Sequence, residues 1–133
     1  MDFTIAFEHP SLDETNQRVV VNVNEGRFAE EVARARTFCF TKDVEFMRAN
    51  RLALGGNLNN AIVLDPYKIL NQGGLRFADE LARHKLLDAL GDLYLLGMPI
   101  IGQYTALKSG HALNNQLARA VLAQSENYDI IQC

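Results

Sequence analysis

Residues 80–96 constrain the fold of this 133-residue chain more than any other stretch, because two periodic patterns coincide there. Apolar side chains recur every three or four residues, which is typical of a helix that buries one face. These apolar members are Leu86, Leu87, Leu90, Leu93 and Tyr94. Beside them, His84, Asp88 and Asp92 follow at steps of four residues, and each step turns a helical side chain by only about 40°. The stretch therefore predicts an amphipathic helix with one polar stripe, ending at Gly97.

The polar stripe allows two interpretations. An imidazole and a carboxylate four residues apart on a helix can bind one metal ion together, as His84 and Asp88 would. The same spacing is also common on helix surfaces that bind nothing. Asp92 adds a second carboxylate one turn further on, and like charges at this spacing destabilise a helix unless a cation is near. The spacing alone leaves both interpretations open.

His111 is a second candidate, at the start of a helix predicted over residues 111–123. The positive end of a helix disfavours a protonated imidazole, so His111 needs a nearby carboxylate to stay charged. If Asp92 reaches it, the pair forms a general acid, and otherwise His111 is an ordinary residue at a helix start. Zinc hydrolysis chemistry also requires a third protein ligand and a base. His9, the remaining histidine, has no spacing relation to the others, so the chain holds only part of such a site.

Composition limits the classes of function. Apolar residues make up 48% and charged residues 22%, which is typical of one globular domain of this length. The net charge of −3 argues against nonspecific nucleic-acid binding, which needs a basic surface. No apolar run approaches the roughly 20 residues that span a bilayer, and the first residues lack a signal-peptide pattern. We therefore expect no transmembrane segment and a cytoplasmic location.

The remaining elements follow from alternation, β-branched residues and turn signals. Strands are predicted over residues 3–7, 18–23, 37–40, 52–54, 60–64, 68–70, 99–107 and 128–131. Helices are predicted over residues 28–34, 42–50, 78–96 and 111–123. In the last helix, the residues expected to point inward are Leu113, Leu117, Val121 and Leu122. Together these elements predict an α+β fold in which helices cover one face of a sheet.

Several motifs in this order and spacing resemble the family of UDP-3-O-acyl-N-acetylglucosamine deacetylases, the zinc enzymes that commit Gram-negative bacteria to lipid A synthesis. The resemblance covers nearly the whole chain. It rests on the motifs Thr37-Phe38, Leu52-Ala-Leu-Gly-Gly56, Asn60-Ala-Ile-Val63, Gly74-Leu-Arg76, His84-Lys-Leu-Leu-Asp-Ala-Leu-Gly-Asp92 and Lys108-Ser-Gly-His-Ala-Leu-Asn-Asn115. The family has two domains of similar β-α-α-β sandwich form, and residues 1–133 resemble the second.

The resemblance implies specific roles at the zinc site. His84 and Asp88 correspond to zinc ligands. His111 corresponds to the protonated residue that stabilises the oxyanion and protonates the leaving amine, and Asp92 to the residue that orients and charges it. The third zinc-ligand histidine and the general-base glutamate belong to the family's first domain. The resemblance therefore predicts that this chain alone folds but is catalytically silent.

The resemblance also implies how an acylated UDP-glucosamine substrate is bound. Lys85 corresponds to a contact with the polar headgroup, and Thr37 and Phe38 to contacts with the sugar and the acyl linkage. Residues 40–63 resemble the family's βαβ insert, which forms a passage for the fatty acyl chain. The positions expected to line that passage are Thr41, Val44, Ala53, Gly56, Asn57 and Val63. Two alternatives stay open: a non-catalytic domain that binds an acyl chain or inhibitor, and a metal-free helical interaction module.

Overall fold

A three-stranded sheet forms the base of the fold in the computed structural model, which describes residues 1–13, 17–23 and 27–131. Strand β1 (Asp2–Thr4) lies in the centre, antiparallel to β2 (Arg18–Val20) and parallel to β5 (Thr105–Leu107). Phe3 pairs in register with Val19 on one side and Ala106 on the other, and all three are buried. Because side chains alternate along a strand, this row defines the one face of the sheet that packs on the core.

Helix α3 (Glu80–Leu93) covers that face and contacts β1 and β2. Its buried apolar residues are Leu81, Ala82, Leu86, Ala89 and Leu93. A short 3₁₀ turn, η2 (Tyr94–Leu96), extends the helix to Gly97, whose φ of 77° is the left-handed conformation that a C-cap glycine adopts without strain. The helix predicted over residues 78–96 is therefore confirmed from Glu80 onward, with its last turn in 3₁₀ form.

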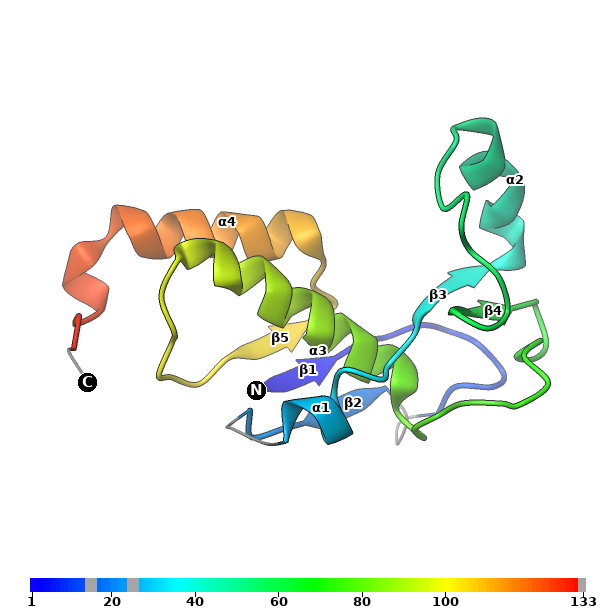
Figure 1. The fold of residues 1–133 in the computed structure, drawn as a ribbon, viewed down its shortest axis with the longest axis horizontal. Coiled ribbons are helices and arrows are strands. Elements are labelled where there is room, and N and C mark those ends of the chain that lie inside the picture. The colour runs from blue at the N-terminus through cyan, green and yellow to red at the C-terminus, as the bar shows by residue number, and fades with distance from the viewer. Residues whose placement is uncertain (14–16, 24–26, 132–133) are drawn as a thin grey trace.

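Helix α4 (His111–Ala123) packs against α3 and η2, so that sheet, α3 and α4 form successive layers (Figure 1). Its helical span is confirmed, but the prediction that its leucines point inward is wrong. Leu113, Leu117 and Leu122 are exposed, whereas the buried residues are Asn114 and Ala118. The α3–α4 contact is close and partly polar. The small side chain of Ala118 and the amide of Asn114 fit it, whereas leucines do not.

A second sheet contains only two strands, β3 (Thr37–Phe40) and β4 (Ala61–Leu64), which pair in parallel. Helix α2 (Thr41–Ala49) connects them, because parallel neighbours need a crossover. Figure 1 shows that this βαβ unit projects away from the three-stranded sheet. The strand predicted over residues 52–54 is wrong, since Arg51 and Ala53 have positive φ and the segment is a turn.

Three further strand predictions are corrected. Only the last three residues of 99–107 form a strand, because β5 pairs with a β1 that is itself three residues long. Residues 68–70 form a single bridge, Ile69 to Leu64. Residues 128–131 follow the 3₁₀ turn η3 (Ser125–Asn127) and lie in neither described sheet. β-Branched residues favour strands only where a partner edge is available.

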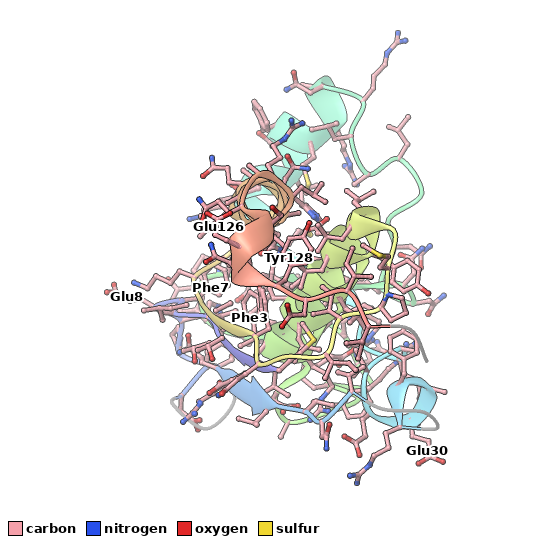
Figure 2. All side chains as sticks on the ribbon, turned by 90° about the vertical axis from the view of Figure 1, so that its left-hand side faces the viewer. Phe3, Phe7, Glu8, Glu30, Glu126 and Tyr128 are labelled. Atoms are coloured by element: carbon pink, nitrogen blue, oxygen red, sulfur yellow. The ribbon has the colours of Figure 1, made fainter. Side chains whose placement is uncertain are left out.

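The predicted α+β class is confirmed. The strand predictions at 3–7 and 18–23 correspond to the shorter β1 and β2, and the helix prediction at 28–34 to α1 (Phe28–Glu31). Figure 2 shows Phe3 inside the molecule, while Glu8 and Glu30 point outward on opposite sides. Across the described ranges, no helix is both long and apolar enough to cross a bilayer.

Candidate metal and acid–base site

Helix α3 carries the predicted polar stripe on the side that is not packed against the sheet. The side chains of His84, Asp88 and Asp92 are 14%, 16% and 18% exposed, so each is largely enclosed while still reaching solvent. Leu81, Leu86, Ala89 and Leu93 of the same helix are buried, which fixes the rotation of α3 about its axis. Tyr94 was predicted on the buried face as well, but it is 77% exposed. The packing of leucines against the sheet therefore sets the direction in which the stripe faces.

The ring of His84 is held by the backbone. Its Nδ1 lies 3.1 Å from the carbonyl oxygen of Ala35, in the segment that leads into β3. A carbonyl can only accept, so Nδ1 donates to Ala35, and in the neutral ring Nε2 then presents a lone pair. That Nε2 lies 3.3 Å from Oδ1 of Asp88, and the edge of the ring meets Phe38 with centroids 6.4 Å apart. Backbone orientation of one ring nitrogen is the usual way in which a protein prepares the other as a metal ligand.

The two oxygens of Asp88 have different neighbours. Oδ1 faces His84, while Oδ2 accepts a 2.9 Å hydrogen bond from Nζ of Lys85. The Lys85 ammonium also lies 5.8 Å from the centre of the Phe38 ring. The carboxylate is thus charge-paired on one side and leaves its other oxygen beside the imidazole.

His111 lies across from this pair, at the first position of α4. Its Nδ1 is 2.9 and 3.0 Å from the two oxygens of Asp92, and its Nε2 is 4.0 Å from Oδ2 of Asp88. Asp92 therefore supplies the carboxylate that an imidazolium at a helix N-terminus needs. The His111 side chain is 69% exposed, so this contact is its main restraint. The structure brings His84, Lys85, Asp88, Asp92 and His111 together.

Asn114, Ser109 and Tyr104 lie beneath the His111–Asp92 pair, and the sequence analysis assigned them no role. Asn114 donates from Nδ2 to Oδ2 of Asp92 at 2.8 Å, and its Oδ1 accepts from the Ser109 and Tyr104 hydroxyls. Burial raises the pKa of the Tyr104 hydroxyl, and the charge of Asp92 adds to this, while a hydrogen bond with Ser109 opposes it. Asn114 is three residues after His111, and that helical spacing was the available signal.

The His84–Asp88 pair fits zinc by its donor chemistry and its spacing. Imidazole nitrogen and carboxylate oxygen are ordinary zinc donors, and two donors of one tetrahedral zinc lie about 3.3 Å apart. The measured Nε2–Oδ1 separation is 3.3 Å. Within the part of the chain that the structure describes, no group of three or more histidine, cysteine or acidic side chains could hold a metal. Both nitrogens of His9 are occupied, by Asp65 and Ser11 backbone groups.

The βαβ unit contains an open cavity of about 350 Å³. Five of the six predicted passage residues line it: Val44, Ala53, Gly56, Asn57 and Val63. Thr41 begins α2 and is not part of the lining, whereas Thr37 and Phe38 are. Further lining residues are Cys39, Met47, Arg48, Leu52, Leu58 and Ala61. Since Phe38 contacts both the cavity and His84, the cavity adjoins the polar site.

Known proteins with similar sequences identify the family. The family model described as UDP-3-O-acyl N-acetylglycosamine deacetylase matches residues 1–123. UDP-3-O-acyl-N-acetylglucosamine deacetylases from Photobacterium profundum, Pasteurella multocida and Tolumonas auensis are 56%, 54% and 52% identical over 97–98% of this chain. The chain spans 42–43% of the length of these relatives.

Fold and site together define an α+β protein that presents an imidazole–carboxylate donor pair opposite a histidine–aspartate pair. The family match and the relatives identify it further. The chain belongs to the UDP-3-O-acyl-N-acetylglucosamine deacetylase family.

Proposed function

We propose that this chain supplies one side of the active site of a zinc-dependent deacetylase that removes acetate from UDP-3-O-acyl-N-acetylglucosamine, the committed step of lipid A biosynthesis. The observation that carries the proposal is the arrangement of His84 and Asp88 opposite His111 and Asp92, with His111 Nε2 4.0 Å from Oδ2 of Asp88. Four polar side chains that converge in this way can bind a metal and move a proton at one reacting centre.

In this proposal, Nε2 of His84 and Oδ1 of Asp88 hold zinc, and both are already oriented by Ala35 and Lys85. A bound zinc ion lowers the pKa of its water and polarises a carbonyl. The third protein ligand and the glutamate base come, by the family resemblance, from the first domain. This chain alone is therefore expected to bind zinc weakly and to be inactive.

His111 acts as the general acid. When water attacks the acetamide carbonyl, a C–O bond forms and the C–N bond breaks, so the leaving nitrogen needs a proton. His111 Nε2–H stabilises the oxyanion and then donates that proton, giving acetate and a free amine. Asp92, which contacts Nδ1, holds the ring in place and stabilises its charged form.

The substrate lies across the site and the βαβ unit. Lys85 contacts the headgroup, and Thr37 and Phe38 contact the sugar and the acyl linkage. The acyl chain enters the cavity beside them, whose apolar members include Val44 and Val63. Its volume of about 350 Å³ is within the range of small-molecule sites.

The first domain is the partner of this chain in the proposal. Leu113 and Leu117 lie one turn apart and form a short exposed apolar row on α4, whereas Leu122 is exposed on another side of the helix. Exposed apolar patches of this kind mark interaction surfaces. We propose that the remainder of the relatives' longer chain covers this row and places its ligand and base opposite His84.

A second candidate function is binding without catalysis. The described residues line an open cavity in the βαβ unit but supply only two donors at the predicted zinc site. On its own, the chain would then hold an acyl chain or an inhibitor directed at that cavity.

Zinc titration followed by calorimetry separates these possibilities. The deacetylase proposal predicts weak zinc uptake by the chain and none by His84→Ala. Turnover of acylated UDP-N-acetylglucosamine is expected only when the first domain is added. Equal, negligible zinc uptake by both proteins favours the metal-free interaction module, and turnover by the chain alone contradicts the assigned roles. Acyl-chain binding that persists without zinc and without turnover in the mixture supports the binding domain.

A further inference from the structure

Asn114 is a buried amide whose side chain links Asp92 on α3 to the Ser109 and Tyr104 hydroxyls. It is only 1% exposed and lies on the face of α4 that meets α3. Its Nδ2 donates to Oδ2 of Asp92 at 2.8 Å. Its Oδ1 accepts at 2.6 Å from the Ser109 hydroxyl and at 2.9 Å from the Tyr104 hydroxyl. A buried amide is tolerated because its donor and acceptor are both satisfied in this way.

The orientation of this amide is determined by its partners. An ionised carboxylate can only accept hydrogen bonds, so the NH₂ group must face Asp92 and the oxygen must face the hydroxyls. Both hydroxyls lie on the segment that leads into α4, at residues 104 and 109, whereas Asp92 lies on α3. Asn114 thus ties the carboxylate of one helix to the entrance of the other.

The Asp92 carboxylate is in turn the main restraint on His111. Both of its oxygens lie within 3.0 Å of Nδ1, while the histidine side chain is 69% exposed. A carboxylate that rotates freely could meet either ring nitrogen. Held by Asn114, it meets Nδ1, and Nε2 is left facing Asp88.

We propose that Asn114 is a positioning residue for the general acid. It locks the Asp92 carboxylate, and through it keeps the proton of neutral His111 on Nδ1 and the Nε2 atom directed into the site. Ser109 and Tyr104 support this by fixing the amide. The catalytic consequence rests on the proposed deacetylase function, whereas the ring orientation and tautomer do not.

The test compares Asn114→Ala with Asn115→Ala in the full 133-residue chain. Asn115 is the same residue type on the same helix, but its side chain accepts from Nε of Arg119 and has no contact with Asp92 in the structure. Two-dimensional ¹H–¹⁵N NMR of the His111 ring, at a pH where it is neutral, reports which nitrogen carries the proton. We expect the original chain and Asn115→Ala to show Nδ1–H almost alone, and Asn114→Ala to show a mixture with Nε2–H.

Kinetics in the protein of the relatives' length, with zinc bound, gives the second measurement. Asn114→Ala should lower kcat by about 10-fold with KM nearly unchanged, the size usual for a residue that orients a functional group. It should also change the pH profile of kcat. Asn115→Ala should change neither kcat nor its pH profile. If Asn114→Ala fails to fold, Ser109→Ala and Tyr104→Phe test the same claim, because each removes one of the two hydroxyls that fix the amide.

The outcomes separate the inference from the function on which it rests. A tautomer mixture in Asn114→Ala together with no turnover by any form would support the positioning role and reject the deacetylase. An unchanged tautomer in Asn114→Ala would reject the positioning role, even if the enzyme turns over normally. If Asn114→Ala does not fold, an unchanged tautomer and pH profile in Ser109→Ala and Tyr104→Phe would reject it in the same way.

Discussion

Helices α3 and α4 are of similar length and carry similar apolar periodicity, yet they meet different surroundings. Helix α3 buries six of its residues, among them Leu81 and Leu86. Helix α4 buries only Asn114 and Ala118. The first lies between the sheet and α4, whereas the second has α3 on one side, and its leucines Leu113, Leu117 and Leu122 are exposed. Periodicity predicts a helix, but the neighbouring layer decides which face is buried.

The two helices also divide the site between them. Helix α3 contributes His84 and Asp88, the proposed zinc ligands, and α4 contributes His111, the proposed general acid. The helices meet through Asp92 and Asn114, which form a direct hydrogen bond. In the proposed function, the well-packed helix thus carries the groups that need a fixed separation, and the less buried helix carries the group that reaches the substrate.

The largest expected effect separates the roles of the two helices. In a protein of the relatives' length, His84→Ala should abolish both zinc binding and turnover. His111→Ala should keep its zinc and lose about 10²- to 10⁴-fold in kcat, the range for a general acid. Metal content by atomic absorption, measured beside steady-state rates, checks both.

Lys108→Ala is the control. It removes a charge near the start of α4, at a side chain that contacts neither the His84–Asp88 pair nor the His111–Asp92 pair in the structure. Loss of zinc from His111→Ala would make His111 a ligand and remove the proposed division between the helices.

The next effect concerns the buried polar residue that each helix carries. Glu80 on α3 is fully buried and accepts from the backbone N–H and guanidinium of Arg36 and from the Arg76 backbone N–H. Burial by itself raises the pKa of Glu80, but the hydrogen bonds from Arg36 and Arg76 outweigh it and hold the pKa below its ordinary value of 4.5. Breaking a buried ion pair costs about 3–5 kcal/mol. Glu80→Gln should lower the free energy of unfolding at pH 7 by that amount.

The sign of the pH dependence follows from the lowered pKa. The stability contributed by Glu80 is complete above pH 4.5 and is lost as the pH falls through the lower folded-state value. Urea denaturation between pH 7 and pH 3 should therefore show a smaller acid loss for Glu80→Gln than for the original chain. Parallel pH curves for the two proteins would show that the Glu80 carboxylate is not the acid-sensitive group. Asn114, the buried polar residue of α4, does not titrate and contributes no such slope.

The sequence predicted the elements whose signals are local. The α3 helix followed from its leucine spacing and Gly97, β1 from alternation, and β2 from its β-branched residues. It could not predict which side of α4 is buried, because that depends on the layer beside it. It also could not exclude strands at residues 99–104 and 128–131, where β-branched residues have no paired edge. The 52–54 turn was missed since positive φ at Ala53, a non-glycine residue, leaves no sequence signal.

The candidate site divides in the same way. His84, Asp88 and Asp92 could be grouped from spacing on one helix. Asp92 and His111 are 19 residues apart in the sequence, on different helices. The sequence therefore allowed only the conditional prediction that the two form a pair if Asp92 reaches His111. Asn114 stood inside a recognised motif without an assigned role, because its importance comes from the Asp92 and Tyr104 side chains that the fold brings to it.

A smaller effect compares one leucine from each helix. Leu86 on α3 is fully buried, so Leu86→Ala should cost about 2–5 kcal/mol of unfolding free energy through lost burial and the remaining cavity. Leu117 on α4 is 42% exposed, so Leu117→Ala should cost less than about 0.5 kcal/mol in the isolated chain. Thermal unfolding by circular dichroism measures both. Equal losses would mean that α4 is packed as tightly as α3 and that its row of leucines is not free to bind.

The smallest effect on stability is expected when that row is made polar. The double variant Leu113→Ser, Leu117→Ser replaces two exposed apolar side chains and keeps the buried Asn114 and Ala118. Serine is a slightly weaker helix former than leucine, so the isolated chain should lose only about 1 kcal/mol. If the row is the surface that the first domain covers, the variant should bind an added first domain at least 10-fold more weakly by calorimetry, because roughly 1.5–3 kcal/mol is lost for each leucine that is no longer buried. Unchanged affinity would place the first domain on another face of this chain. The lower burial of α4 than of α3 would then mean that α4 faces solvent, not that it forms an interface.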